Sequence, residues 1–536
     1  MKVFFMNKTW LNFLDRKASF KKVESRIFDL VVIGGGITGA GIARDAAMRG
    51  LDVALVEARD FASGTSSRSS KMIHGGLRYL AQGNIALVRE AANERAILRS
   101  IAPHFTQPMP FVIPAASKIE IAKLKTALWT FEKLANVTKS DQHKIWSLKE
   151  IKENEPLIRA DKLSGALIYT EYLTDDARLT LANVRSAQEA GATILSYASV
   201  KHIIMEDNKA KGVEVVGALP GENMSARIHA KLIVNAAGPW VDAIRLLENH
   251  SAHERLQLTK GIHVVLPKSI LPISRTVIIT TEDNRSIFAV PKEDYVYLGT
   301  TDTFYGAATY WPEITRADVN YLFAAVIKNF NIEPLKHEDI VSVWAGLRPL
   351  IAEEGKQPTD ISRKDEIWTG AGGILSIAGG KLTAYRKMAE RVVSNVEQLL
   401  GRRPTPCTTD KKTLPGGDID TSNLHENTAF EKLKRSDRKQ LISQYGSEAI
   451  NIARANNRLH AEVTQAVQVE GALTLEDYWM RRSSRALFDY GAGLPILSEA
   501  ANIMGDFYNW SESRRDSEIK ICESIHNKNL ANIGVL

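Results

Sequence analysis

DLVVIGGGITGAGIARDAAMRGLDVALVE, residues 29–57, decides the fold of this chain. Residues 30–33 form a short apolar run of the kind that a parallel strand buried on both faces shows. After a glycine turn, residues 40–49 are rich in good helix formers, and residues 53–56 form a second apolar run. The stretch therefore predicts a strand, a tight turn, a helix and a second strand, which together make a βαβ unit.

The turn carries three glycines, Gly34, Gly36 and Gly39, in the spacing G-x-G-x-x-G. The first glycine permits the tight turn, the second lets the main chain approach a pyrophosphate, and the third lets helix and strand pack closely. The helix that begins near Ile37 and Thr38 then presents its N-terminal amides to an anion. This pattern predicts a dinucleotide-binding site.

Glu57 closes the second strand, 23 residues after Gly34. A carboxylate in this place accepts hydrogen bonds from the ribose hydroxyls of an adenosine. It also argues against a cofactor with a 2′-phosphate, because two negative charges would then face each other. These features alone leave NAD and FAD equally compatible with the turn.

The bulk composition is that of a globular enzyme. A chain of 536 residues is expected to form two or three domains, and it contains 44% hydrophobic and 24% charged residues. No apolar run approaches the ~18 residues of a membrane-spanning helix. Cys407 and Cys522 show neither C-x-x-C nor paired spacing, so we expect no disulfide framework and no metal site. The formal net charge of +7 favours anionic partners.

A loop rich in hydroxyl groups follows Glu57, and it reads TSSRSSKMIHGGLRY over residues 65–79. Small side chains with many donors suit a loop that wraps a phosphate and a ring system. The candidate cofactor contacts in this loop are Ser66, Ser67, Ser70, Lys71, His74, Gly75 and Gly76.

At this point the sequence resembles the FAD-dependent glycerol-3-phosphate dehydrogenases of the D-amino-acid-oxidase-like flavoprotein class. The run TSSRSSKMIHGGLRYL is much more specific than the glycine fingerprint, and TDDARL at 174–179, LIVNAAGPW at 232–240 and GTTD at 299–302 resemble further segments of the family. The resemblance extends from about residue 29 to about residue 400 and is weaker beyond. It implies an α/β fold with a Rossmann-like FAD-binding domain, an antiparallel-sheet substrate domain and a C-terminal helical domain.

The resemblance, together with the strand and helix patterns, predicts these domain boundaries. The chain divides into an N-terminal extension (1–24), a discontinuous FAD-binding domain (25–84, 165–254 and 340–403), a substrate-binding domain (85–164 and 255–339), a linker (404–423) and a C-terminal helical domain (424–536).

The resemblance also implies a non-covalently bound FAD with further contacts outside the first βαβ unit. These contacts are expected from Val200, Ala237, Gly238, Trp240, Gly380, Lys381, Leu382 and Thr383. The substrate it implies is glycerol 3-phosphate, which is small and doubly negative and therefore needs a cationic site. Substrate-binding residues are expected to be Arg78, Tyr79, His263, Arg348, Arg363 and Lys381.

The implied reaction is hydride transfer from C2 of glycerol 3-phosphate to flavin N5, which gives dihydroxyacetone phosphate. His263, Arg348 and Lys381 are the predicted catalytic residues, with His263 as the base that takes the hydroxyl proton. Alternatively, Arg348 lowers the pKa of the C2 hydroxyl by hydrogen bonding to it.

The resemblance also implies that electrons pass to a membrane quinone, from an enzyme held on the anionic cytoplasmic face of the inner membrane. Residues 118–134 read as a basic amphipathic helix, which fits either a membrane surface or a helix with its apolar face in the core. Residues 1–24 interleave lysines and arginines with aromatic side chains, and three alternatives stay open for them: a segment at a membrane surface, a disordered tail, or a tail that docks on the protein itself. The sequence leaves open whether the protein forms a homodimer.

Three alternatives remain at this stage. The first is a glycerol-3-phosphate oxidase that passes electrons to O₂. The second is a nucleic-acid-modifying flavoprotein, although the chain lacks a basic stripe with interleaved stacking aromatics, so no nucleic acid is expected as a partner. The third is an amine or amino-acid oxidase of the same fold.

Overall fold

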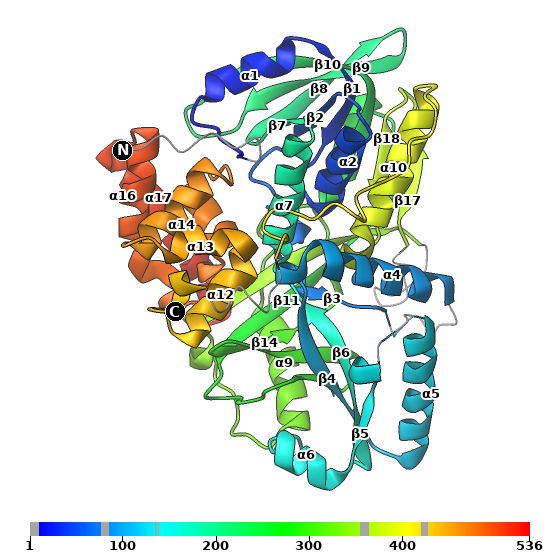
Figure 1. Cartoon of the computed structure of the whole chain (residues 1–536), viewed down its shortest axis with the longest axis vertical. Coiled ribbons are helices and arrows are strands. Elements are labelled where there is room, and N and C mark those ends of the chain that lie inside the picture. Colours follow the sequence, from blue (N-terminus) through cyan, green and yellow to red (C-terminus); the bar gives the residue numbers. More distant parts are fainter. Residues whose placement is uncertain are drawn as a thin grey trace.

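The computed structural model describes residues 10–76, 85–134, 137, 139–353, 364–419 and 427–535. They form an eight-stranded sheet with helices on both faces, a ten-stranded sheet, and a C-terminal group of helices (Figure 1). This architecture confirms the predicted α/β class with three kinds of domain. Arg78, Tyr79 and Arg363, all predicted to bind substrate, lie outside the described residues.

The eight-stranded sheet contains the predicted βαβ unit. Its strand order is β17-β18-β10-β1-β2-β7, and β9 and β8 extend it from β10 as antiparallel strands. Strands β1, β2, β7, β10 and β18 are parallel to one another. The strand bounds are β1 Ile27–Ile33, β2 Val53–Val56, β7 Thr193–Leu195, β8 Ala198–Glu206, β9 Lys209–Gly217, β10 Ser225–Asn235, β17 Glu366–Thr369 and β18 Leu375–Ala378.

Both faces of this sheet are covered, which explains the continuous apolar run in β1. Leu30 and Val32 belong to the core formed with α2 (Ile37–Met48), α7 (Asp176–Glu189) and α10 (Tyr385–Leu399). Val31 and Ile33 pack on the opposite side, in the core that includes α1 (Arg16–Glu24), α8 (Val241–Glu248) and the β8–β9 pair.

The ten-stranded sheet is antiparallel except where β4 and β12 pair in parallel. Its order is β15-β11-β14-β13-β12-β4-β6-β3, with β16 beside β11 and β5 beside β6. The bounds are β3 Met72–Ile73, β4 Gln107–Ala115, β5 Lys144–Trp146, β6 Gly165–Leu173, β11 Leu256–Pro267, β12 Thr276–Thr280, β13 Ser286–Lys292, β14 Tyr295–Gly299, β15 Thr303–Phe304 and β16 Ser342–Ile351. The helices near this sheet are α4 Ile85–Ile101, α5 Lys118–Leu134, α6 Leu148–Asn154 and α9 Arg316–Asn329.

The two sheets divide the chain differently from the predicted domain boundaries. Strands β3, β6 and β16 fall within the ranges predicted for the FAD-binding domain, yet all three belong to the ten-stranded sheet. The physical reason is that the chain changes sheet between elements with almost no loop. Only Thr174 and Asp175 separate β6 from α7, so no composition change marks the crossing.

The C-terminal region is helical, as predicted, and packs against both other parts (Figure 1). Its helices are α12 Arg435–Tyr445, α13 Ala449–Ala453, α14 Arg458–Gln468, α15 Arg485–Phe488, α16 Leu497–Tyr508 and α17 Glu512–Asn532. A π-helical segment, η9 (Asp477–Arg482), lies between α14 and α15 and is buried throughout. Such segments are rare and occur frequently at functional sites.

Packing holds the described residues before β1 and the connecting segment in place. Residues 10–24 dock on the protein itself, because Leu11 bridges to Glu470 and α1 buries Phe20 and Val23. In the predicted linker, Leu414 is buried and its amide donates to the carbonyl of Ile101. Among the helices of the described ranges, none has both the length and the apolar character needed to cross a bilayer.

Candidate active site

A cavity of about 590 Å³ lies at the carboxyl ends of the parallel strands, where ligands bind in open α/β sheets. Its walls come from the turn after β1, the ends of β2 and β10, and the turn after β18. The predicted cofactor residues that line it are Gly34, Gly36, Ile37, Thr38, Glu57, Ser66, Val200, Ala237, Gly238, Trp240, Gly380, Lys381 and Leu382.

The glycine turn has the geometry that a pyrophosphate cradle requires. Gly34 has a φ of +109°, and a Cβ there would lie 2.6 Å from the carbonyl oxygen of Ala236. A Cβ on Gly39 would lie 1.9 Å from the carbonyl oxygen of Gly34, so only glycine lets the helix approach the strand. Gly39 therefore lies behind the cavity and shapes it without lining it.

Glu57 lies at the cavity wall with its carboxylate held by main-chain amides. Gly35 N donates to Oε2 at 2.6 Å, and Arg59 N donates to Oε1 at 2.8 Å. Burial raises the pKa of Glu57 above its usual range, against these two hydrogen bonds. Each carboxylate oxygen keeps a second lone pair for a ribose hydroxyl. The turn, the helix start and this acid fit an adenine dinucleotide without a 2′-phosphate.

Part of the hydroxyl-rich loop holds itself in place and does not line the cavity. Lys71 forms an ion pair with Asp176, with Nζ 2.6 Å from Oδ1, and donates to the carbonyl of Ser67 at 3.0 Å. Ser67 Oγ is buried without a hydrogen-bond partner among the described residues. Ser70 Oγ lies 2.9 Å from His263 Nε2. Their direct contact with the cofactor remains a prediction.

The loop end at residues 74–76 is held by similar contacts. Gly75 N donates to the carboxylate of Glu171, with distances of 3.1 and 3.2 Å to its two oxygens, and a Cβ on Gly75 would collide with Phe131. His74 N donates to Thr383 Oγ1 at 3.2 Å. Gly76, with a φ of +77°, completes this turn. Cofactor contacts by His74, Gly75, Gly76 and Thr383 also remain predictions.

Strands β11 and β16 bring two of the three predicted catalytic residues, His263 and Arg348, to one face of the ten-stranded sheet. The register pairs His263 with Trp344, Gly261 with Gly346, and Thr259 with Arg348. Because these pairs are spaced by two residues on each strand, they share a face. The two glycines leave a floor without side chains between His263 and Arg348, and this face meets the hydroxyl-rich loop at Arg68 and Ser70.

His263 is a buried, neutral histidine. Its ring stacks on Trp344, Nε2 contacts Ser70, and Nδ1 has no hydrogen-bond partner among the described residues. Burial lowers its pKa well below the ordinary histidine value, and the charges of Arg348 and Lys71 lower it further. At neutral pH the ring is therefore unprotonated, as a proton acceptor must be.

Arg348 is held in a fixed orientation over the glycine floor. Its NH1 lies 2.9 Å from Asp302 Oδ1, and its NH2 donates to Thr300 Oγ1 at 3.1 Å. An added Cβ on Gly261 would lie 2.4 Å from NH2. Lys381 lines the cavity just before the helical turn η6 (Leu382–Ala384), which leads into α10. The structure thus places His263 and Arg348 on one face and Lys381 at the cavity.

The sequence predicted Trp240 as a cofactor contact but revealed neither its stacking partner Tyr310 nor the arginine behind that ring. Tyr310 and Trp240 stack with ring centroids 4.2 Å apart, and both line the cavity. The guanidinium of Arg59 lies 4.7 Å from the centre of the Tyr310 ring. Tyr310 stands in a loop without periodicity, so no signal in the sequence could have placed it at the site.

Comparisons with known proteins agree with this geometry. A family model described as FAD dependent oxidoreductase matches residues 29–386, and one described as the C-terminal domain of alpha-glycerophosphate oxidase matches residues 407–515. The aerobic glycerol-3-phosphate dehydrogenase of Staphylococcus epidermidis is 40% identical over 534 residues, covering 95% of this chain and 96% of that protein. The Staphylococcus aureus enzyme of the same name is 41% identical over 541 residues, covering 95% of this chain and 97% of that protein.

Solved structures give the same result. The glycerol-3-phosphate dehydrogenase from Bacillus halodurans, complexed with FAD, aligns with a TM-score of 0.81 and 34% identity over 97% of this chain and 99% of that one. Together with the cavity, these matches define the chain as an FAD-dependent oxidoreductase, which confirms FAD as its cofactor. Within this class it belongs to the family of the aerobic glycerol-3-phosphate dehydrogenases.

Proposed function

We propose that this chain oxidises sn-glycerol 3-phosphate to dihydroxyacetone phosphate and passes the electrons to a membrane quinone. Bound FAD supplies the acceptor, flavin N5, for the hydride that leaves C2 of the substrate. The observation that carries the proposal is the shared face of β11 and β16, where a neutral histidine and a fixed arginine flank a glycine floor.

The substrate proposal rests on charge and size. Glycerol 3-phosphate carries a dianionic phosphate, and a guanidinium binds phosphate oxygens through its planar fork. Arg348 offers that fork beside the floor, and Lys381 adds a second cation at the cavity. Glycine at position 261 lets the Arg348 guanidinium lie close over the strand, since a Cβ there would be 2.4 Å from NH2. Phosphate binding by Arg78, Tyr79 and Arg363 completes the proposal, since the relatives are named for this substrate.

The proton step is assigned to His263. The C2 hydroxyl must lose a proton as its hydride leaves, and the unprotonated ring of His263 takes it. Stacking on Trp344 fixes the plane of that ring, and the Ser70 hydroxyl fixes its rotation. Arg348 lowers the pKa of the C2 hydroxyl by donating to its oxygen. The two residues act together, one removing the proton and the other stabilising the oxygen that loses it.

Quinone as acceptor is supported by the surface around α5. The apolar residues that predicted an amphipathic helix face the protein core, where Leu128 and Phe131 are buried, so this stripe is not a membrane contact. The opposite side exposes Ile119 (70%) and Trp129 (56%). Exposed lysines accompany them at Lys118, Lys123, Lys125 and Lys133.

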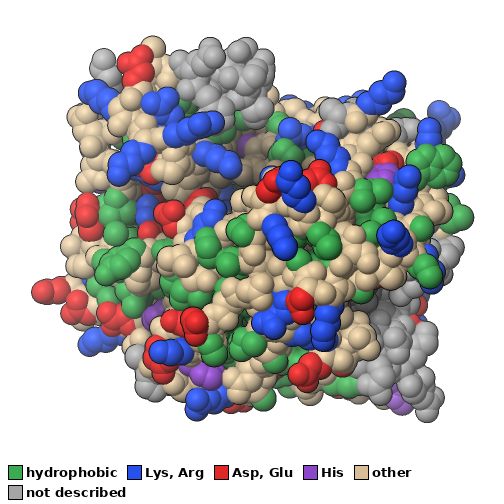
Figure 2. Space-filling view, turned by 90° about the horizontal axis from the view of Figure 1, so that it is seen from below, with side chains coloured by type: hydrophobic (Ala, Val, Ile, Leu, Met, Phe, Trp, Pro, Cys, Tyr) green, Lys and Arg blue, Asp and Glu red, His purple; other side chains and the backbone are tan. Residues whose placement is uncertain are grey.

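This surface continues at the same end of the molecule (Figure 1). There β5 exposes Ile145 and α6 exposes Leu148, and Lys144 and Lys149 are also exposed. Figure 2 views the molecule from that end and shows hydrophobic side chains interspersed with basic and acidic ones. Apolar side chains among cations favour peripheral binding to an anionic membrane, which we propose to be the cytoplasmic face of the inner membrane.

A cavity of about 200 Å³ next to α5 adds support for a quinone. Phe131, Tyr169 and Tyr172 contribute aromatic rings to it, and Arg95 and Arg99 contribute cations. Arg95 pairs with Glu171, which in turn accepts from Gly75 N in the hydroxyl-rich loop. The cavity thus lies between the α5 surface and a loop predicted to contact the cofactor.

The second candidate function is an oxidase that uses O₂. The C-terminal region matches a domain named for alpha-glycerophosphate oxidase, which favours keeping this candidate. The L-alpha-glycerophosphate oxidase from Mycoplasma pneumoniae, with FAD bound, shares the fold at a TM-score of 0.54 and 19% identity. We propose quinone as the electron acceptor because the exposed side of α5 favours binding to a membrane.

Two measurements test the proposal. Anaerobic addition of glycerol 3-phosphate to the holoenzyme should bleach the flavin absorbance near 450 nm, whereas sarcosine and glycine should leave it unchanged. Turnover should then be faster with a soluble quinone analogue than with O₂. Bleaching by sarcosine or glycine alone would contradict glycerol 3-phosphate as the substrate. Rapid release of peroxide would contradict quinone as the electron acceptor.

A further inference from the structure

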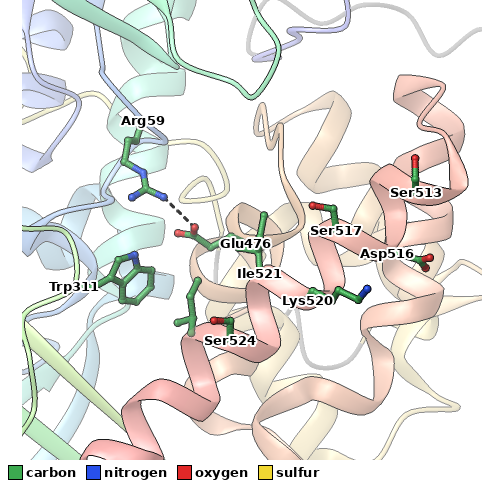
Figure 3. Close-up of a pocket in the computed structure, with 10 residues that line it drawn as sticks. Arg59, Trp311, Glu476, Ser513, Asp516, Ser517, Lys520, Ile521 and Ser524 are labelled. Carbon is green, nitrogen blue, oxygen red and sulfur yellow. Dashed lines mark hydrogen bonds and ion pairs between the residues drawn. The ribbon is translucent and has the colours of Figure 1, made fainter.

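A second large cleft, of about 610 Å³, separates the FAD-binding domain from the C-terminal helix α17. One wall contains Arg59, Trp311 and Glu476, and the other consists of residues from α17 (Figure 3). Arg59 and Glu476 point toward each other, with NH2 and Oε2 3.1 Å apart (Figure 3). This ion pair joins the loop that follows the first βαβ unit to the C-terminal domain.

The Arg59 end of the pair supports the cofactor cavity in two ways. Its guanidinium covers the outer face of Tyr310, whose ring stacks on Trp240 in the cavity wall. Its main-chain amide donates to the carboxylate of Glu57, which faces the cavity. A displacement of Arg59 would therefore loosen both the aromatic wall and the acid predicted to bind ribose.

The Glu476 end is fixed by a buried charge network. Glu476 Oε1 accepts from Arg481 NH1 at 2.9 Å, and Arg481 Nε donates to Asp60 Oδ2 at 2.5 Å. Arg482 also pairs with Asp60. These residues are almost inaccessible to solvent, so Glu476 offers Arg59 a stationary carboxylate.

We propose that Glu476, supplied by the C-terminal domain, is a positioning residue for FAD that acts through Arg59. The pair fixes the Tyr310–Trp240 wall and the Glu57 carboxylate in the arrangement that FAD needs, and so slows release of the cofactor. The proposal depends on FAD as cofactor and is independent of the substrate and of the final electron acceptor.

The exposure of Arg59 separates this role from a purely structural one. Its side chain is 31% exposed in the cleft. Partly exposed ion pairs contribute little to folding stability, because water screens the charges and two long side chains lose freedom. Loss of Arg59 should therefore leave the protein folded and affect mainly the cofactor cavity.

The test measures FAD release from the full-length holoenzyme, followed as the rise of flavin fluorescence after dilution. Arg59→Ala should release FAD about tenfold faster, which corresponds to the loss of one charge-assisted hydrogen bond at a partly exposed site. The visible circular dichroism of the bound flavin should change as well. Lys520→Ala is the matched control, because Lys520 lines the same cleft and its amino group points away from the pair (Figure 3).

A double-mutant cycle tests whether the two residues act as a unit. Glu476→Gln should also speed release, and Arg59→Ala with Glu476→Gln should be no faster than the faster single variant. Arg59→Lys, which keeps the charge, should restore part of the slow release. If Glu476→Gln does not fold, the Arg59 variants and the control still decide.

The proposal is overturned if Arg59→Ala, with an unchanged thermal midpoint, releases FAD at the wild-type rate. It is also overturned if Lys520→Ala accelerates release equally. Failure of the proposed function looks different, because it would leave FAD release intact while glycerol 3-phosphate fails to bleach the flavin.

Discussion

The rings of His263 and Trp344 stack across β11 and β16 with centroids 4.5 Å apart and an angle of 9° between their planes. Tyr297 meets the His263 ring edge-on, at 6.2 Å between centroids. The imidazole is thus enclosed by aromatic surface on its buried side and has one hydroxyl contact, to Ser70. Such an environment excludes water and favours the neutral form of the imidazole. The neutral ring can accept a proton.

Replacement of His263 should lower turnover without loss of flavin. A general base contributes about 10²–10⁴-fold to rate, so we expect His263→Gln to lower kcat by about that range. Because burial and Arg348 lower the pKa of His263, the wild-type acid limb should lie well below pH 6.5. The control is His104→Gln, a buried histidine outside the proposed site. An unchanged pH–rate profile in His263→Gln would eliminate the base assignment.

Arg348→Ala and Lys381→Ala should keep bound flavin and lose most activity. A hydrogen bond to a charged group is worth ~1.5–3 kcal/mol, which predicts a fall of about 10- to 150-fold in kcat/KM for each variant. Arg348→Lys should also be slow, since an ammonium keeps the charge beside Asp302 but lacks the planar fork. Arg159→Ala, which removes contacts to the carbonyls of Ile327 and Phe330, is the control. Normal kinetics in either site variant would contradict the assignment.

Gly39→Ala should abolish FAD binding. The new methyl group would lie 1.9 Å from the Gly34 carbonyl oxygen, and neither main-chain segment has a flexible end that could yield. The ratio of flavin to protein absorbance after purification measures the effect. Gly306→Ala should leave this ratio unchanged, because no atom lies within 4 Å of a Cβ there. Full flavin content in Gly39→Ala would mean that the turn is not the cofactor cradle.

Stability should fall as the pH drops below the ordinary histidine pKa. Burial, with the charges of Arg178 and Arg185, lowers the pKa of His104 from 6.5 to about 3. The unfolded chain then binds a proton near pH 6 that the native state does not, so the free energy of unfolding decreases with falling pH. Protonation of His104 in the unfolded chain should by itself lower the free energy of unfolding by about 1.4 kcal/mol at pH 5.5, relative to neutral pH. Urea unfolding of the wild type and of His104→Gln, each at pH 7.5 and 5.5, measures this loss in the free energy of unfolding. The contribution of His104 to the loss should be absent in the variant.

Membrane binding should depend on the exposed side of α5. Transfer of one large apolar side chain to an apolar phase is worth ~1.5–3 kcal/mol, so Trp129→Ser should weaken binding to anionic vesicles about tenfold or more. Ile27→Ser is the control, since Ile27 is 66% exposed on β1, in the other sheet. Equal binding by wild type and Trp129→Ser in a flotation assay would refute a role for this helix.

The sequence was most informative where the determinants are local. The turn from Gly34 to Gly39 and the acid at Glu57 could be predicted because a cradle needs fixed spacings within one βαβ unit. The sequence could not predict the sheet to which β6 and β16 belong, because strand pairing depends on partners far away in the chain. Lys71 shows the same limit, since its partner Asp176 is 105 residues distant and only the fold brings them together.

The Asp60–Arg481 ion pair joins residues 421 positions apart. During synthesis at ~5–20 residues per second, about 20–80 seconds pass between the emergence of these two side chains. The glycine turn is thus synthesised long before the charge network that supports its neighbouring loop. Asp60 gains its buried ion pairs with Arg481 and Arg482 only after η9 has been synthesised, so we expect docking of the C-terminal domain to be a late step in folding.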